Sequence, residues 1–142
     1  MLPGGNRRPG GVFIPCCTGG RDTALDVTVV CPLQRALVAE AATTPGSALA
    51  YAYREKMRKV GEECRRQGII FLPLAAESLG GWHSVAREQV QKLGSALARQ
   101  TGQEEGEVMS QLFQRLSVCL MKGNAAILAD KMLITEHVPT YL

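Results

Sequence analysis

The hydrophobic and polar positions of this 142-residue chain first follow the period of β-strands. Val12–Ile14 is a short apolar run, and Ala24–Cys31 is rich in β-branched residues. Residues 18–22 between them have turn chemistry, which predicts an antiparallel hairpin with a long loop. Because strand side chains alternate between faces, Asp26 is expected on the face opposite to Leu25.

The next part of the chain predicts a long helix followed by a third strand. Ser47 is the expected N-cap of the helix, and Gly68 is the expected stop. Ile69–Ala76 is a mostly apolar run of strand length. A continuous apolar run after a helix predicts a strand that lies beside an earlier one and is buried on both faces.

The last third of the chain has helical spacing, and three apolar residues there predict a buried helical face: Leu112, Phe113 and Leu116. The fold class expected is α/β, with a small mixed sheet flanked by helices and a helical C-terminal extension. Residues 1–11 are expected to be an irregular leader, and residues 12–142 a single domain. Within that domain, 12–81 form the core and 82–142 the helical extension.

Composition narrows the class of protein. The chain is 46% hydrophobic and 20% charged with a net charge of +3, which excludes a membrane protein and a disordered chain. Its five cysteines form no C-x-x-C pair, so reduced thiols and a nuclear or cytoplasmic location are expected. The paired glycines lack a strand-to-helix context, so no nucleotide or other small-molecule cofactor is expected.

Three polar residues are candidates for chemistry, and each also has an ordinary interpretation. Asp26 lies in an apolar strand, where a buried carboxylate needs a partner, unless its face is solvent-exposed. Lys56 lies in a charged helical segment, whose face can equally be solvated and joined by Glu–Lys pairs. Glu77 ends the third strand, where it can equally serve as a first-turn acid of the next helix.

Together these residues predict a phosphodiester-cleaving site at one edge of the sheet. Carboxylates of Asp26 and Glu77 would bind Mg²⁺, which activates water and stabilises the phosphate. Lys56 would position that water or neutralise the scissile phosphate. The helix would attract DNA through four further basic residues: Lys59, Arg65, Arg66 and Arg58.

The order of several short motifs resembles a domain that follows the reverse transcriptase in animal retroelement-like open reading frames. The resemblance runs from about Arg8 over nearly the whole chain. It rests on 8–15, 24–29, Pro32-Leu33, 42–48, Lys56, Cys64, Gly68, Pro73-Leu74, Glu77, Gly80, Trp82, Arg115-Leu116, Asn124-Ala125 and Ile127-Leu128.

That domain is similar to the restriction-endonuclease-like (PD-(D/E)xK) group, and the resemblance implies metal-dependent cleavage of DNA. It would place the first acid of the group's pattern at Gly11 and the second at Asp26. Thr28 stands where the strand lysine would be, and Lys56 is a plausible replacement from the helix. Gly11 carries no oxygen ligand, so the site loses a carboxylate unless Asp22 or Glu77 substitutes.

The sequence therefore leaves three functions open. The first is a retroelement-derived, Mg²⁺-dependent DNA endonuclease-like domain, degenerate at Gly11, that acts on DNA beside a reverse transcriptase module of the same element. The second is a catalytically inactive DNA-binding or assembly module of a retroelement polyprotein. The third is an unrelated α/β scaffold.

Overall fold

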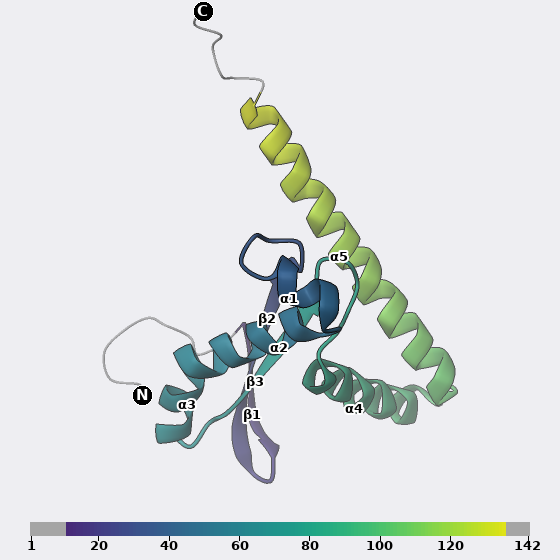
Figure 1. The fold of residues 1–142 in the computed structure, drawn as a ribbon. Coiled ribbons are helices and arrows are strands. Elements are labelled where there is room, and N and C mark those ends of the chain that lie inside the picture. The colour runs from purple at the N-terminus through teal and green to yellow at the C-terminus, as the bar shows by residue number, and fades with distance from the viewer. Residues whose placement is uncertain (1–10, 136–142) are drawn as a thin grey trace, which may run out of the picture. The chain divides into compact units, whose positions relative to one another are not determined.

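The chain forms two units, which meet in sequence between Gln89 and Val90. The computed structural model describes residues 11–135. The first unit contains a three-stranded mixed sheet with helices packed on it, and the second is helical (Figure 1). The expected fold class, α/β with a helical C-terminal part, is confirmed.

The sheet begins with an antiparallel hairpin of β1 (Val12–Thr18) and β2 (Arg21–Val30), as predicted. The prediction of a long loop was wrong. The turn consists of Gly19 and Gly20 alone, with φ of 58° and 75°. Two successive positive φ angles give a two-residue turn whose twist matches that of the strands, so β1 continues past Pro15. Pro15 is tolerated because it lies on an edge strand, where the register is irregular.

The third strand, β3 (Ile70–Glu77), pairs with β2 in parallel and gives the strand order β1-β2-β3. The predicted strand at Ile69–Ala76 is thus confirmed to within one residue at each end. A parallel pair needs a crossover connection, and the helices between β2 and β3 supply it.

The crossover holds one helix that the sequence did not predict, α1, and a long helix with three parts. The bounds are α1 (Val38–Thr43), α2 (Ser47–Lys56), the π-helical η1 (Met57–Gly61) and α3 (Glu62–Arg66). The predicted N-cap at Ser47 was wrong, because Gly46 holds that position with a φ of 81° and no side chain caps the helix. Glycine adopts this left-handed conformation without steric cost.

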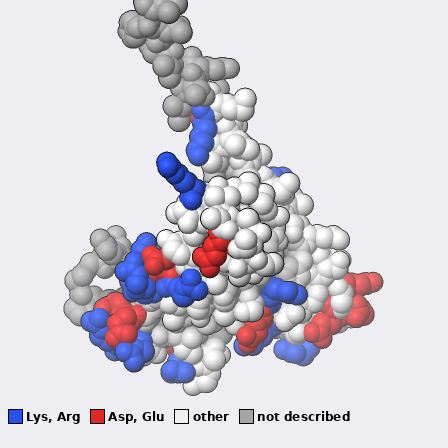
Figure 2. Space-filling model, viewed as in Figure 1, with Lys and Arg blue, Asp and Glu red and all other residues white. Residues whose placement is uncertain are grey.

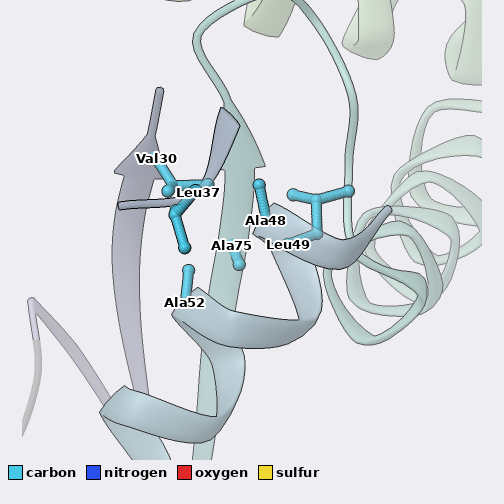
Figure 3. Close-up of a cluster of buried hydrophobic side chains, with 6 residues drawn as sticks. All are labelled: Val30, Leu37, Ala48, Leu49, Ala52 and Ala75. Carbon is cyan, nitrogen blue, oxygen red and sulfur yellow. The ribbon is translucent and has the colours of Figure 1, made fainter. Parts of the chain in front are cut away.

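The core of the first unit lies between the crossover helices and one face of the sheet. One buried cluster joins the end of β2 and the middle of β3 to α2, and its members are Val30, Leu37, Ala48, Leu49, Ala52 and Ala75 (Figure 3). A second cluster, formed by Ala24, Cys64 and Phe71, lies nearer the start of β3. On the opposite face, Val27 and Val29 are 60% and 50% exposed. Strand alternation thus gives β2 one covered and one open face within this unit.

The second unit consists of most of α4 (Ser84–Thr101), which begins in the first unit, and α5 (Glu105–Thr135). Ala98 and Val108 are buried in it. A Cβ atom on Gly94 would lie only 2.5 Å from the Sδ atom of Met109, so this glycine permits the close packing of α4 and α5.

The predicted buried face of α5 is only half-buried. Leu112, Phe113 and Leu116 all keep intermediate exposure, whereas Val108 at the start of the helix is buried. No helix in the part of the chain that the structure describes is long and apolar enough to cross a membrane. The five cysteines, all among the described residues, form no disulfide, in agreement with the expected reduced state.

Candidate functional site

Asp26 lies in the middle of the sheet, on the face that carries the helices. It belongs to the central strand β2 and shares this face with the buried Ala24 and Val30. Its register partner on β3 is Pro73. The prediction that Asp26 faces away from Leu25 agrees with the burial of alternate residues along β2. A carboxylate here is partly withdrawn from water and needs a partner.

Lys56 is that partner. Its Nζ atom donates a hydrogen bond to Oδ2 of Asp26 at 2.7 Å, across 30 residues of sequence. The side chains of Lys56 and Asp26 are 33% and 23% exposed to solvent. The ion pair is therefore partly shielded but still accessible to water. The structure therefore brings together two of the three residues that were predicted to form the site.

A distortion of the long helix begins directly after Lys56. Residues 57–61 form a π-helix, a rare conformation that is found mostly as single turns and frequently at functional sites. Gly61 lies against Met57, whose Cε would be 3.1 Å from a Cβ atom at this position. The wider π-helical turn therefore begins directly after Lys56, the residue whose side chain contacts Asp26 on the sheet.

Gly11 is adjacent to Asp26 in the register of the hairpin. Val12 pairs with Leu25 and Phe13 with Ala24, so one further step of this antiparallel register places Gly11 opposite Asp26. Directly opposed residues share a face, with Cβ atoms roughly 4.5–5.5 Å apart. The extended register therefore places Gly11, the residue just before β1, as the cross-strand neighbour of Asp26. A Cβ atom built at Gly11 would be 3.9 Å from the Leu25 carbonyl oxygen, an ordinary contact.

Glu77 is on the same face as Asp26 but is not brought to it. Its register partner on β2 is Val30, four residues beyond Asp26. At ~3.3 Å per residue, this offset separates the two positions by about 13 Å along the strands. The carboxylate of Glu77 lies instead against Gly81, where a Cβ atom would be 2.9 Å from Oε2. The backbone N–H of Glu77 donates to the Gly81 carbonyl, so this residue is part of the turn after β3.

Asp22 also has a local role. Its Oδ1 atom accepts a hydrogen bond from the backbone N–H of Cys16 at 3.0 Å, within the hairpin of β1 and β2. Cys16 has a φ of 51°, and this bond supports its left-handed backbone. Asp22 is four residues from Asp26 on one strand, so it is as far from Asp26 as Glu77 is.

The residues present do not fit the Mg²⁺ site that the resemblance implies. Mg²⁺ requires a near-octahedral set of oxygen ligands at 2.0–2.1 Å, often from one or two carboxylates with water and phosphate. Asp26 contributes one carboxylate, and that carboxylate is bound to an ammonium group. Nowhere in residues 11–135 do three His, Cys, Asp or Glu side chains group in a way that could hold a metal ion.

The four basic residues predicted to bind DNA lie on η1 and α3, each close to an acid of the same helix. Figure 2 shows the mixed blue and red surface over this helix. All four are more than 60% exposed. The pairs with their N–O distances are Arg58–Glu55 (2.9 Å), Lys59–Glu55 (3.8 Å), Arg65–Glu62 (2.9 Å) and Arg66–Glu63 (3.6 Å).

These helical ion pairs shift the titration of their carboxylates. The hydrogen bond from Arg58 lowers the pKa of Glu55, and the hydrogen bond from Arg65 lowers the pKa of Glu62. Both carboxylates therefore stay ionised at a more acidic pH than an isolated glutamate. Exposed i,i+3 and i,i+4 pairs are weak, so a phosphate can compete for the guanidinium groups at low cost.

The structure contains a ring stack that the sequence did not predict. His83 stacks on Tyr53 of α2, with ring centroids 4.4 Å apart and an interplanar angle of 2°. The Nδ1 atom of His83 accepts a hydrogen bond from the backbone N–H of Val85, so this histidine caps the start of α4. Burial lowers its pKa. The contact joins residues 30 positions apart, and no local pattern of the sequence encodes it.

Comparison with known proteins gives no relative from which a role could be transferred. No protein family matches the chain, and neither a curated protein nor a solved structure matches it.

Proposed function

We propose that the first unit is a DNA-binding domain with the layout of a restriction-endonuclease-like core that lacks a complete metal centre. It binds the backbone of duplex DNA and does not cleave it. The proposal follows the second of the functions that the sequence left open, the inactive DNA-binding module of a retroelement polyprotein. A reverse transcriptase of the same element would be its partner, in the nucleus or the cytoplasm.

The observation that carries the proposal is the ion pair of Asp26 and Lys56 beside Gly11. In the resemblance, Asp26 holds the second acid of the nuclease pattern, and Lys56 replaces the strand lysine. The 2.7 Å contact supports both assignments, because a helix lysine meets the strand acid directly. The register supports the assignment of Gly11, since a first acid there would lie beside the second. An active metal-dependent nuclease is less well supported, because this carboxylate is absent.

Attraction to DNA would come from the long helix. Residues 54–66 contain six basic and three acidic side chains, which gives this one segment a net charge of +3. Duplex DNA attracts such a surface through its phosphates, and binding releases the counterions condensed on the DNA. Lys56, at the sheet, would add a phosphate contact once it exchanges its bond to Asp26.

The test is fluorescence anisotropy of a labelled duplex titrated with the full chain at several salt concentrations. Binding is expected to weaken as salt rises, with a log–log slope of about −0.9 for each phosphate neutralised. The double variant R65Q/R66Q should bind more weakly at every concentration of salt, and its slope should be shallower by about two. Neutral glutamine is suited to helices, so the fold should persist.

The matched control is R99Q/R115Q, which removes two exposed arginines from α4 and α5 and changes the net charge equally. If both double variants lose the same affinity, the attraction is a property of net charge and not of the helix. If the unchanged chain binds no duplex even at low salt, the proposal is rejected.

A further inference from the structure

The C-terminal part of α5 exposes large apolar side chains in a row. Val118, Met121, Leu128 and Met132 are between 52% and 68% exposed, and Ile127 is 57% exposed. Over 121–132 the structure describes no buried side chain. Contiguous apolar surface of this kind marks an interaction site in soluble proteins.

The spacing of these residues is that of a helix pair. Val118, Met121, Ala125, Leu128 and Met132 follow one another at intervals of three, four, three and four residues. This spacing has a mean period of 3.5, which keeps every member on the seam between two packed helices. We call these five residues the α5 seam. The charged residues of the segment, Lys122, Asp130 and Lys131, all lie outside it.

We propose that the α5 seam pairs with the seam of a second copy of this chain, in an antiparallel arrangement. A two-fold axis between positions 126 and 127 would place Ala125 opposite Leu128 of the second copy and Met121 opposite Met132. A small residue then faces a large one, and two adaptable methionines face each other. A parallel pair would instead set Ala125 against Ala125 and leave a gap, which close-packed interfaces avoid.

The charges agree with this arrangement. Under this axis Lys122 is level with Lys131 of the second copy, but the two lysines flank opposite sides of the seam. On its own side Lys122 lies beside Ala129 of the second copy, and Lys131 lies beside Asn124. No lysine of one copy faces a lysine of the other, so like charges do not oppose association. The surface is also self-complementary, as the two-fold symmetry of most homodimers requires.

The apolar area of the α5 seam determines how stable the dimer is expected to be. From Val118 to Met132 the helix rises about 21 Å. The axis pairs three large seam side chains of each copy, Met121, Leu128 and Met132. These six side chains, each roughly 60% exposed and each worth on the order of 60–120 Å², would bury about 200–450 Å² of apolar surface. Stable interfaces usually bury at least about 1,200 Å², so the dimer is expected to be weak and to form reversibly with concentration.

The experiment is sedimentation equilibrium of the full chain from about 10 μM to about 1 mM, a range suited to weak association. Two variants add one lysine each at neighbouring positions of nearly equal exposure: L128K in the α5 seam and I127K outside it. The unchanged chain should show a reversible monomer–dimer equilibrium. L128K should weaken the dimer by at least tenfold, whereas I127K should change the dissociation constant by no more than about twofold. Both positions are exposed, so circular dichroism should show an intact fold.

A monomer over the whole concentration range would overturn the proposal. An equal loss in L128K and I127K would also overturn it, because general hydrophobicity and not the α5 seam would then drive association. Co-sedimentation of the monomer with phosphatidylcholine vesicles, lost in both variants, would assign the surface to lipid instead. The inference is independent of the proposed DNA binding, since it concerns the second unit alone.

Discussion

Asp26 and Glu77 stand on neighbouring parallel strands, four residues apart in register. Asp26 pairs with Pro73, and Glu77 pairs with Val30. Both are on the face of the sheet that carries the helices, but about 13 Å of strand separates their positions. Two carboxylates that share one Mg²⁺ must bring their oxygen atoms within about 4 Å of each other, twice the metal–ligand distance.

This offset determines whether Glu77 can replace the carboxylate that the resemblance expects at Gly11. Glu77 cannot compensate for Gly11 unless β3 slides by four residues along β2. Such a slide would move Phe71 past the start of β2 and out of its buried cluster with Ala24 and Cys64. The remaining polar pair, Asp26 and Lys56, is an ion pair with no second acid to recruit a cation. In the proposed function, Lys56 of this pair binds a DNA phosphate.

The Asp26–Lys56 ion pair should be measurable as an energetic coupling. Each single change, D26N or K56M, leaves a partly buried charge without its partner, so each should lower the free energy of unfolding by about 1–3 kcal/mol. The double variant should lose less than the sum, with a coupling of about 1 kcal/mol, because both side chains keep some exposure. Urea unfolding of all four chains gives the cycle. Strictly additive losses would show that the pair contributes nothing.

The fold was largely predictable because its signals are local. A short apolar run and a run of β-branched residues identified the two hairpin strands, and the apolar run after the helix identified β3. The loop between the strands was predicted too long, because the turn type depends on positive φ at both Gly19 and Gly20, which composition alone does not specify. The short helix α1 was missed, because it has no side-chain cap and no buried residue of its own.

The candidate site was predictable only in part. Asp26, Lys56 and Glu77 were expected to converge at one edge of the sheet. Asp26 and Lys56 do meet, but on the central strand β2 and as a direct ion pair that the sequence did not predict. The separation of Glu77 from Asp26 was not expected, because register in a parallel pair follows from packing at distant residues and not from the strand sequence itself. The stack of Tyr53 on His83 is likewise a tertiary contact between a helix and a later loop.

His83 predicts a dependence of stability on pH. Burial lowers its pKa below the ordinary value of 6.5, so the unfolded chain takes up the proton first as the pH falls. The free energy of unfolding should therefore be constant above about pH 7 and decrease once the pH drops through 6.5. Urea unfolding at pH 7.5 and 5.5 measures this decrease.

The matched variant for this test is H83N. Asparagine retains a side-chain acceptor for the N–H of Val85 but does not titrate. It should lose less stability than the unchanged chain between the two pH values, although it also loses the ring stack and is less stable at both. His137 is present in both chains, so it cancels in the comparison. An identical decrease in the two proteins would remove His83 as the cause.

Core substitutions should distinguish buried from half-buried apolar positions. Phe71 is 5% exposed and packs against Ala24 and Cys64, so F71A should cost about 3–5 kcal/mol. Leu116 on α5 keeps intermediate exposure, so L116A should cost less than about 2 kcal/mol. Chemical unfolding followed by circular dichroism compares the two. A larger loss for L116A would mean that α5 buries this residue against a partner.

The missing carboxylate can be restored. Gly11 lies opposite Asp26 in the hairpin register, and a Cβ atom there makes only an ordinary contact with the Leu25 carbonyl, so G11D should fold. Two adjacent carboxylates can then share one cation, which should give G11D a measurable affinity for Mn²⁺ and Mg²⁺ by calorimetry. Metal-dependent nicking of supercoiled plasmid DNA should appear with it, since a bound cation activates water and stabilises the phosphate.

Two variants make the restoration test specific. G11N has the shape of aspartate without its charge and should gain neither metal affinity nor nicking. G11D/D26N keeps the new acid but loses the original one, and it should lose both gains if the two acids serve one metal ion. Nicking that persists in G11D/D26N would place the activity outside this pair of strands or reveal a contaminating nuclease. If G11D binds metal no better than G11N, the site around Asp26 and Lys56 is not an incomplete nuclease centre, and the ion pair would then be only a structural link between β2 and the long helix.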